Sequence, residues 1–110
     1  MKNKRRQRRR AGRQERELAE ATGGWQQKAS GGLPWAKGDV RSRNRYRAEC
    51  KFTEAKSYIV KRSTLDKISS ECSFGEAPVL DLAFIDSSGM TADRWVMIPF
   101  SVWEQLCVNL

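Results

Sequence analysis

Apolar and charged residues alternate along residues 46–52, and this is the clearest local pattern in the chain. Successive side chains of a β-strand point to opposite faces, so the alternation predicts a strand with one face in a core and one charged face. The two sets are Tyr46, Ala48, Cys50 and Phe52 on the apolar face, and Arg47, Glu49 and Lys51 on the charged face.

The residues before this segment predict a helix, a loop and a strand pair. Good helix formers such as Leu18 and Ala19 fill the first stretch, and Gly23-Gly24 ends it. Gly, Ser and Pro then mark a loop. The expected elements are a helix over 13–22, a short strand over 25–28, a loop over 29–37, a strand over 39–41 and a hairpin turn over 42–45.

The residues after it alternate between helix and strand, which predicts one small α/β domain of mixed α+β type. Ser63 is a plausible N-cap, and Ser101-Val102-Trp103-Glu104 matches a capping box. Gly75 ends the first of these helices, and Gly89 marks a turn. The expected elements are an extended segment over 57–61, a helix over 64–73, strands over 78–85 and 94–98 around a turn at 86–93, and a terminal helix from 101.

Composition excludes several classes of protein. A chain of 110 residues forms one small domain, and no apolar stretch is long enough to span a membrane. The absence of histidine nearly excludes zinc sites and histidine-based catalysis. Cys50, Cys72 and Cys107 are odd in number and widely spaced, so a disulfide framework is not expected. A reducing, cytoplasmic compartment fits best, whether archaeal, bacterial or viral.

The net charge of +8 is concentrated at the N-terminus. Residues 1–13 carry eight basic side chains and no acidic ones, and residues 1–12 are expected to be a disordered basic arm ahead of a domain over 13–110. The arm either contacts nucleic-acid phosphates or only solubilises and localises the chain. The arginines expected to contact DNA are Arg5, Arg6, Arg8, Arg9, Arg10 and Arg13.

The charged face of residues 46–52 carries candidate metal chemistry. Glu49 and Lys51 are two residues apart on a strand and share a face, while Asp39 begins the neighbouring strand. Two carboxylates and the carbonyl of Cys50 suit Mg²⁺, which keeps several of its waters. The lysine could orient or deprotonate water, or stabilise charge on a phosphate. The alternative is a solvated strand face with an ion pair, and the local pattern leaves both open.

The order of these motifs resembles the PD-(D/E)xK nuclease superfamily, and within it the archaeal-type Holliday junction resolvases. The resemblance covers roughly residues 13–103. The matching segments are Gln14-Glu15-Arg16-Glu17-Leu18, Ala29-Ser30-Gly31, Gly38-Asp39-Val40, Ala48-Glu49-Cys50-Lys51, Tyr58-Ile59-Val60-Lys61-Arg62, Phe74-Gly75-Glu76-Ala77-Pro78-Val79-Leu80 and Arg94-Trp95-Val96-Met97-Ile98.

The resemblance implies a small mixed sheet of about five strands flanked by helices, active as a two-fold homodimer. Asp39 and Glu49 would bind Mg²⁺ or Mn²⁺, and Lys51 would serve the attacking water. Glu15 would complete the acidic cluster, directly or through water, and Ser30 would lie near DNA. The implied activity is the resolution of four-way DNA junctions. Two alternatives remain: a nuclease that nicks branched, flapped or duplex DNA, and a non-catalytic basic nucleic-acid-binding protein.

Further residues receive less specific interpretations. Asp81 lies in an apolar strand, so a buried partner such as a lysine or a backbone amide is expected for it rather than catalysis. Trp95 and Trp103 are expected in the core or in a dimer interface, and Cys50 in the core. Basic residues expected to contact phosphates, with a solvated face as the alternative, are Arg41, Arg43, Arg45, Arg47, Lys56, Lys61 and Arg62.

Overall fold

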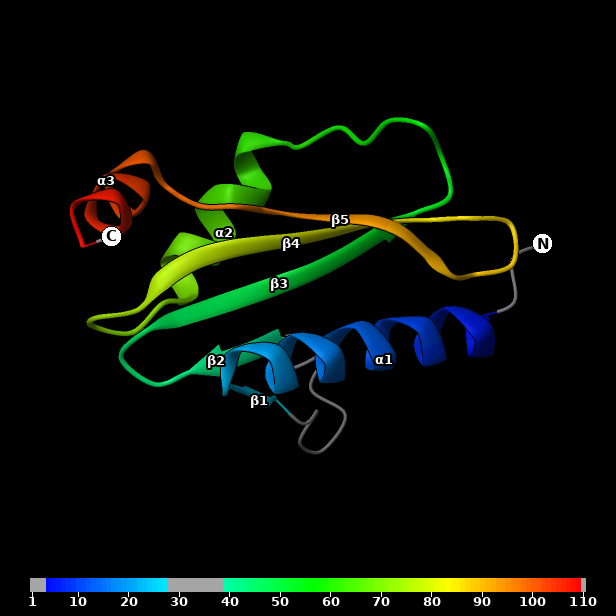
Figure 1. Cartoon of the computed structure of the whole chain (residues 1–110), viewed down its shortest axis with the longest axis horizontal. Helices are drawn as coiled ribbons and strands as arrows, with labels where there is room; N and C mark the ends of the chain where they lie inside the picture. The colour runs from blue at the N-terminus through cyan, green and yellow to red at the C-terminus, as the bar shows by residue number, and fades with distance from the viewer. Residues whose placement is uncertain (1–3, 28–38, 110) are drawn as a thin grey trace.

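The computed structural model describes residues 4–27 and 39–109, with Asp39 described for its backbone only. Its strands form one mixed sheet in the order β1-β2-β3-β4-β5, in which β3 and β4 run parallel and the other neighbours antiparallel (Figure 1). The expected mixed α/β fold with about five strands is confirmed. The elements are α1 (Lys4–Thr22), β1 (Trp25–Gln26), β2 (Asp39–Ser42), β3 (Tyr46–Thr53), α2 (Arg62–Glu71), β4 (Ala77–Ile85), β5 (Thr91–Met97) and α3 (Phe100–Val108).

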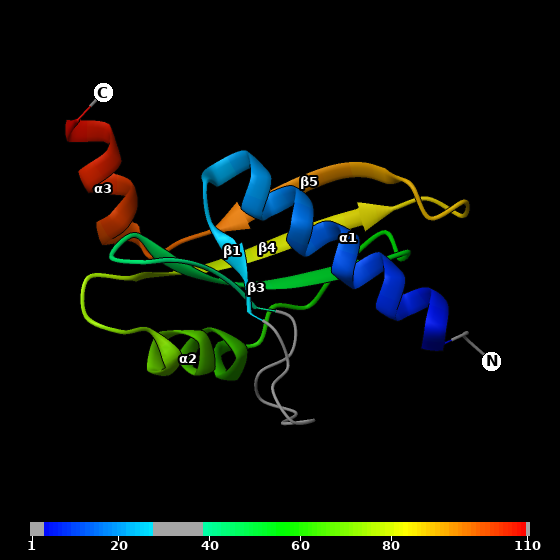
Figure 2. The ribbon, with the colours of Figure 1, turned by 90° about the horizontal axis from the view of Figure 1, so that it is seen from below.

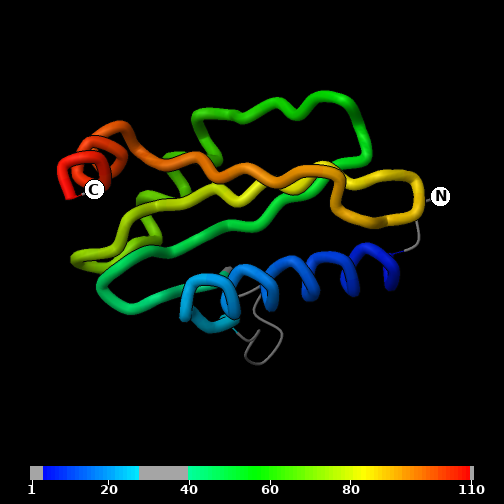
Figure 3. Tube along the Cα trace, viewed as in Figure 1, coloured from blue at the N-terminus to red at the C-terminus, as the bar shows by residue number. Residues whose placement is uncertain are grey.

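Helices α1 and α2 lie on opposite faces of this sheet (Figure 2). Parallel strands need a crossover connection, and α2 lies in the connection between β3 and β4. Figure 3 shows the segment 54–61 leaving the end of β3 and running back along the sheet to the start of α2. Among the described residues, no helix combines the length and apolar character needed to cross a membrane.

The core follows the alternation of β3. Leu18 of α1 packs with Val40 and Ala48, which are 0% and 1% exposed, and Cys50 packs against this cluster. The even positions of β3 therefore face α1. The odd positions face α2, where Ile68 is buried. The two-face reading of residues 46–52 is confirmed.

Helix α1 begins at Lys4 instead of Arg13, so most of the segment expected to be a disordered arm is helical. Arginine is a good helix former, and two arginines fasten this half of the helix to the sheet. Arg10 donates a hydrogen bond to Thr91 Oγ1, and Arg13 Nη2 donates to the carbonyl of Gly89 at 3.0 Å. Contacts with a distant turn thus order a segment whose composition alone predicts disorder.

The two expected N-caps are wrong. Helix α2 is capped by Lys61, whose carbonyl accepts from the amides of Thr64 and Leu65, so Ser63 lies inside the helix. Helix α3 follows Pro99, whose carbonyl accepts from the amides of Val102 and Trp103. Neither cap residue makes a side-chain hydrogen bond to its helix, so the backbone geometry of the preceding residue sets each start.

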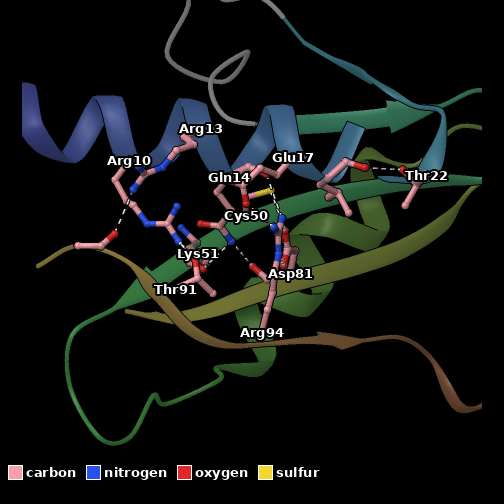
Figure 4. Close-up of polar contacts among 12 residues, drawn as sticks. Arg10, Arg13, Gln14, Glu17, Thr22, Cys50, Lys51, Asp81, Thr91 and Arg94 are labelled. Atoms are coloured by element: carbon pink, nitrogen blue, oxygen red, sulfur yellow. Dashed lines mark hydrogen bonds and ion pairs between the residues drawn. The ribbon is translucent and has the colours of Figure 1, made fainter. Parts of the chain in front are cut away.

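A buried polar network holds α1 on the sheet (Figure 4). Asp81 is fully buried on β4, and Arg94 Nε of β5 donates to its Oδ1 at 2.8 Å. Gln14 Nε2 donates to the carbonyls of Asp81 and Lys51 at 3.2 and 3.0 Å. Arg94 Nη2 in turn donates to the carbonyl of Gln14 at 2.9 Å. The expectation that Asp81 has a buried partner is confirmed, but the partner is the guanidinium of Arg94 rather than a lysine or a backbone amide.

Cys50 belongs to the same network, and its thiol is unreactive. Its thiol donates to Asp81 Oδ2 at 3.4 Å. Burial, followed by the negative charge of Asp81, raises the pKa of Cys50 far above its ordinary value. Because the thiolate is the reactive form, the thiol is inert near neutral pH.

Loss of the Arg94 side chain should destabilise the fold strongly. Arg94→Met leaves the Asp81 carboxylate buried without its cation, and we expect the free energy of unfolding to fall by about 3 kcal/mol. Denaturant unfolding measures this change, with Arg43→Met on the exposed hairpin turn as the control. A loss no larger than that of the control would contradict a stabilising role for the pair.

The three cysteines should react at very different rates. Cys107 is exposed, whereas Cys50 keeps its proton because burial and Asp81 raise its pKa. In the native protein at about pH 8, we expect iodoacetamide to label Cys107 first and Cys50 last. Peptide mass spectrometry over a time course measures the order. Equal labelling of Cys50 and Cys107 before unfolding would contradict it.

Candidate active site

A tight hairpin brings Asp39 opposite Glu49. The turn between β2 and β3 is closed by the amide of Arg45, which donates to the carbonyl of Ser42 at 3.0 Å, and Asn44 takes a positive φ of 63° there. In the antiparallel ladder Asp39 pairs with Glu49. Directly opposed residues share a face, with Cβ atoms about 5 Å apart. The register therefore puts both carboxylate-bearing positions on one face.

Glu49 and Lys51 face the same side and touch. Lys51 Nζ lies 3.3 Å from Glu49 Oε1. The Glu49 side chain is 14% exposed and that of Lys51 is 40% exposed. The carboxylate is thus partly withdrawn from water, while the ammonium group can reach an incoming ligand.

Helix α2 adds a residue that sequence reasoning missed. Lys67 Nζ lies 3.9 Å from Glu49 Oε2 and 3.8 Å from Glu71 Oε1. The spacing of Lys67 and Glu71 marks them as helix neighbours, but no local signal links either to Glu49. Their approach depends on how α2 packs on the sheet. Glu49 therefore has an ammonium group on each side.

Glu15 lies on the other face of the sheet. It is 8% exposed on α1, and its Oε1 accepts from Gln26 Nε2 at 3.5 Å. Its negative charge also contributes to the raised pKa of Cys50, after burial and Asp81. The structure thus places Glu15 near the same stretch of β3 as Glu49, from the α1 side. It does not assemble Glu15 with Glu49 and Lys51 on one face.

The donor atoms at this site fit a hard divalent cation. Within the described side chains, no group of three or more acidic or cysteine residues could hold a metal ion. The side chain of Asp39 lies outside that description. Glu49, Asp39 from the paired position and the carbonyl of Cys50 are the groups that would hold Mg²⁺, which needs only a few protein oxygens.

Two of the arginines expected to contact phosphates are engaged inside the fold. Arg41 Nε forms an ion pair with Glu76 at 2.5 Å, and Arg47 Nη2 lies 3.3 Å from Glu71. Burial alone would raise the pKa of Glu76, but hydrogen bonds from Arg41 and from the amide of Ser73 outweigh it and lower that pKa. Arg41 and Arg47 therefore brace the segment around α2.

The remaining expected DNA contacts fall into three groups. Arg45 donates to the carbonyl of Thr22 at 3.1 Å, Arg13 donates to the carbonyl of Gly89 and Arg10 is 6% exposed, so these three serve the fold. Ser30 lies outside the described residues. The exposed members are Arg5, Arg6, Arg8, Arg9, Arg43, Lys56, Lys61 and Arg62.

Comparison with known proteins adds no relative. No protein-family model matches the chain, and neither the curated proteins nor the solved structures contain a significant match. The function therefore has to be argued from the geometry of Asp39, Glu49 and Lys51.

Proposed function

We propose that this chain is a Mg²⁺-dependent endodeoxyribonuclease of the PD-(D/E)xK type that resolves four-way DNA junctions. The observation that carries the proposal is the register of β2 and β3, which opposes Asp39 to Glu49, with Lys51 Nζ 3.3 Å from Glu49. Two carboxylate-bearing positions on one face can hold a divalent cation, and a lysine beside them can act on the attacking water, which suits metal-assisted phosphodiester hydrolysis.

Each residue has a distinct task in the proposed reaction. Asp39, Glu49 and the carbonyl of Cys50 would hold the cation, which would supply polarisation of the phosphate and a lowered pKa of the attacking water. Lys51 orients or deprotonates the attacking water, or stabilises the charge that develops on the phosphate. Its half-exposed ammonium group suits contact with a substrate that arrives from solvent.

Lys67 supports the same chemistry from α2. Its side chain is 59% exposed and lies 3.9 Å from Glu49, so it can swing toward an anionic substrate. When Lys67 turns toward the substrate, Glu49 loses one of its two ammonium partners and its carboxylate becomes more available to a cation. Lys67 is therefore a positioning residue in the proposal.

A homodimer in a cytoplasmic compartment completes the proposal. Two active sites related by a two-fold axis would make paired nicks in a symmetric junction. Trp95 and Trp103 are 65% and 53% exposed, so they are not core residues, and with Met97 and Leu106 they supply exposed apolar surface on β5 and α3. Such surface is typical of a protein–protein interface. The free cysteines suit a reducing compartment.

Cleavage assays test the proposal. Purified protein with Mg²⁺ is given labelled four-way junctions, flaps and linear duplexes. Glu49→Gln and Lys51→Met should each lower the single-turnover rate on junctions by about 100-fold or more, since each removes a group that acts on the metal or the water. Glu104→Gln, an exposed carboxylate change on α3, is the matched control and should cleave normally.

Two other results of the cleavage assay would change the proposed function. A preference for flaps or duplex, lost in the same variants, would replace junction resolution with a more general nicking activity. Binding without cleavage in either Mg²⁺ or Mn²⁺ would refute the nuclease and leave a basic nucleic-acid-binding protein, which the arginine-rich start of α1 favours.

A further inference from the structure

Helix α1 carries arginines with two different roles. Those turned toward the sheet hold the helix in place: the Arg10 guanidinium lies 5.9 Å from the ring centroid of Phe52, and Arg13 donates to the carbonyl of Gly89. With Thr91 accepting from Arg10, they anchor the N-terminal half of the helix to the end of β3 and to the β4–β5 turn. Their charge is therefore used within the fold.

A second set of arginines lies on the outer side of the same helix. Arg5, Arg9 and Arg16 follow one another at spacings of four and seven residues, which places them on one face of an α-helix. All three are exposed. At 1.5 Å per residue, they form a stripe about 16 Å long, with Arg8 at its edge.

Two of the outer arginines, Arg9 and Arg16, keep their charge available for a ligand. In the part of the chain that the structure describes, no ion pair joins Arg9 or Arg16 to a carboxylate. An open groove also runs along this half of α1, and Arg9 and Arg16 contribute to its lining together with Thr53 and Ser88. The stripe is therefore accessible to a large anion.

The charges on this helix oppose its own stability. Arginines four residues apart on a helix, such as Arg5 and Arg9, repel each other. The first turn holds no acidic residue, although the positive end of the helix dipole favours anions there. An anion bound along this face would relieve both unfavourable effects.

We propose that the outer stripe of Arg5, Arg9 and Arg16, with Arg8 beside it, binds the phosphate backbone of double-stranded DNA. The proposal rests on the proposed function only in taking DNA as the polyanion. Arginine contacts to phosphate oxygens fix the position of a protein on DNA but carry no sequence information. Binding there is consequently independent of sequence.

The test measures binding without cleavage. Labelled duplexes and four-way junctions are titrated by fluorescence anisotropy in EDTA over a series of KCl concentrations. Arg9→Gln with Arg16→Gln should lower the slope of log K against log salt by about two, one for each lost phosphate contact. The matched control, Arg9→Lys with Arg16→Lys, keeps both positive charges at the same positions and should keep the slope.

The outcomes separate this proposal from the nuclease proposal. Circular dichroism and unfolding of both double variants check that the helix persists. With folding intact, an unchanged slope in the Arg9→Gln/Arg16→Gln variant overturns the stripe, and so does an equal loss in the Arg9→Lys/Arg16→Lys variant, because that variant keeps both charges. A normal slope change in a protein that never cleaves supports the stripe and refutes only the nuclease.

Discussion

The carboxylate of Asp81, fully buried at the centre of the sheet, is the constraint on which the rest of the structure depends. A charge in that position needs a partner, and Arg94 supplies it from the neighbouring strand. The same arginine binds the carbonyl of Gln14, whose side chain reaches the carbonyls of Asp81 and Lys51. One ion pair thereby fixes α1, β4 and β5 against the strand that carries the candidate active site.

Local patterns predicted the sheet well because the alternation of apolar and polar residues is a short-range signal for a strand. The two faces of residues 46–52, the hairpin before them and the strands after them all follow from short-range sequence. The start of α1 did not, because Arg10 is held by Thr91, far away in the chain. The two helix caps were predicted wrongly because the first helical hydrogen bonds are accepted by the carbonyls of Lys61 and Pro99 and not by the nearby serines.

In the candidate site, too, some residues could be predicted from local sequence and others depend on tertiary packing. Glu49 and Lys51 could be paired from sequence because residues two apart on a strand share a face. Lys67 could not, since its place beside Glu49 depends on the packing of a separate helix. Arg47 shows the limit of the alternation argument, because it shares the face of Glu49 but is engaged by Glu71. Whether a surface cation faces solvent or a carboxylate is a tertiary property.

The placement of α1 and α2 on opposite faces sets a condition on the shape of any bound DNA (Figure 2). A duplex lying flat along Arg9 and Arg16 has the whole thickness of the sheet between itself and Glu49. A single DNA that contacts both on one protomer must therefore pass around an edge of the sheet, which a forked or bent DNA can do. In the proposed complex, the architecture of the protein would itself select against straight DNA.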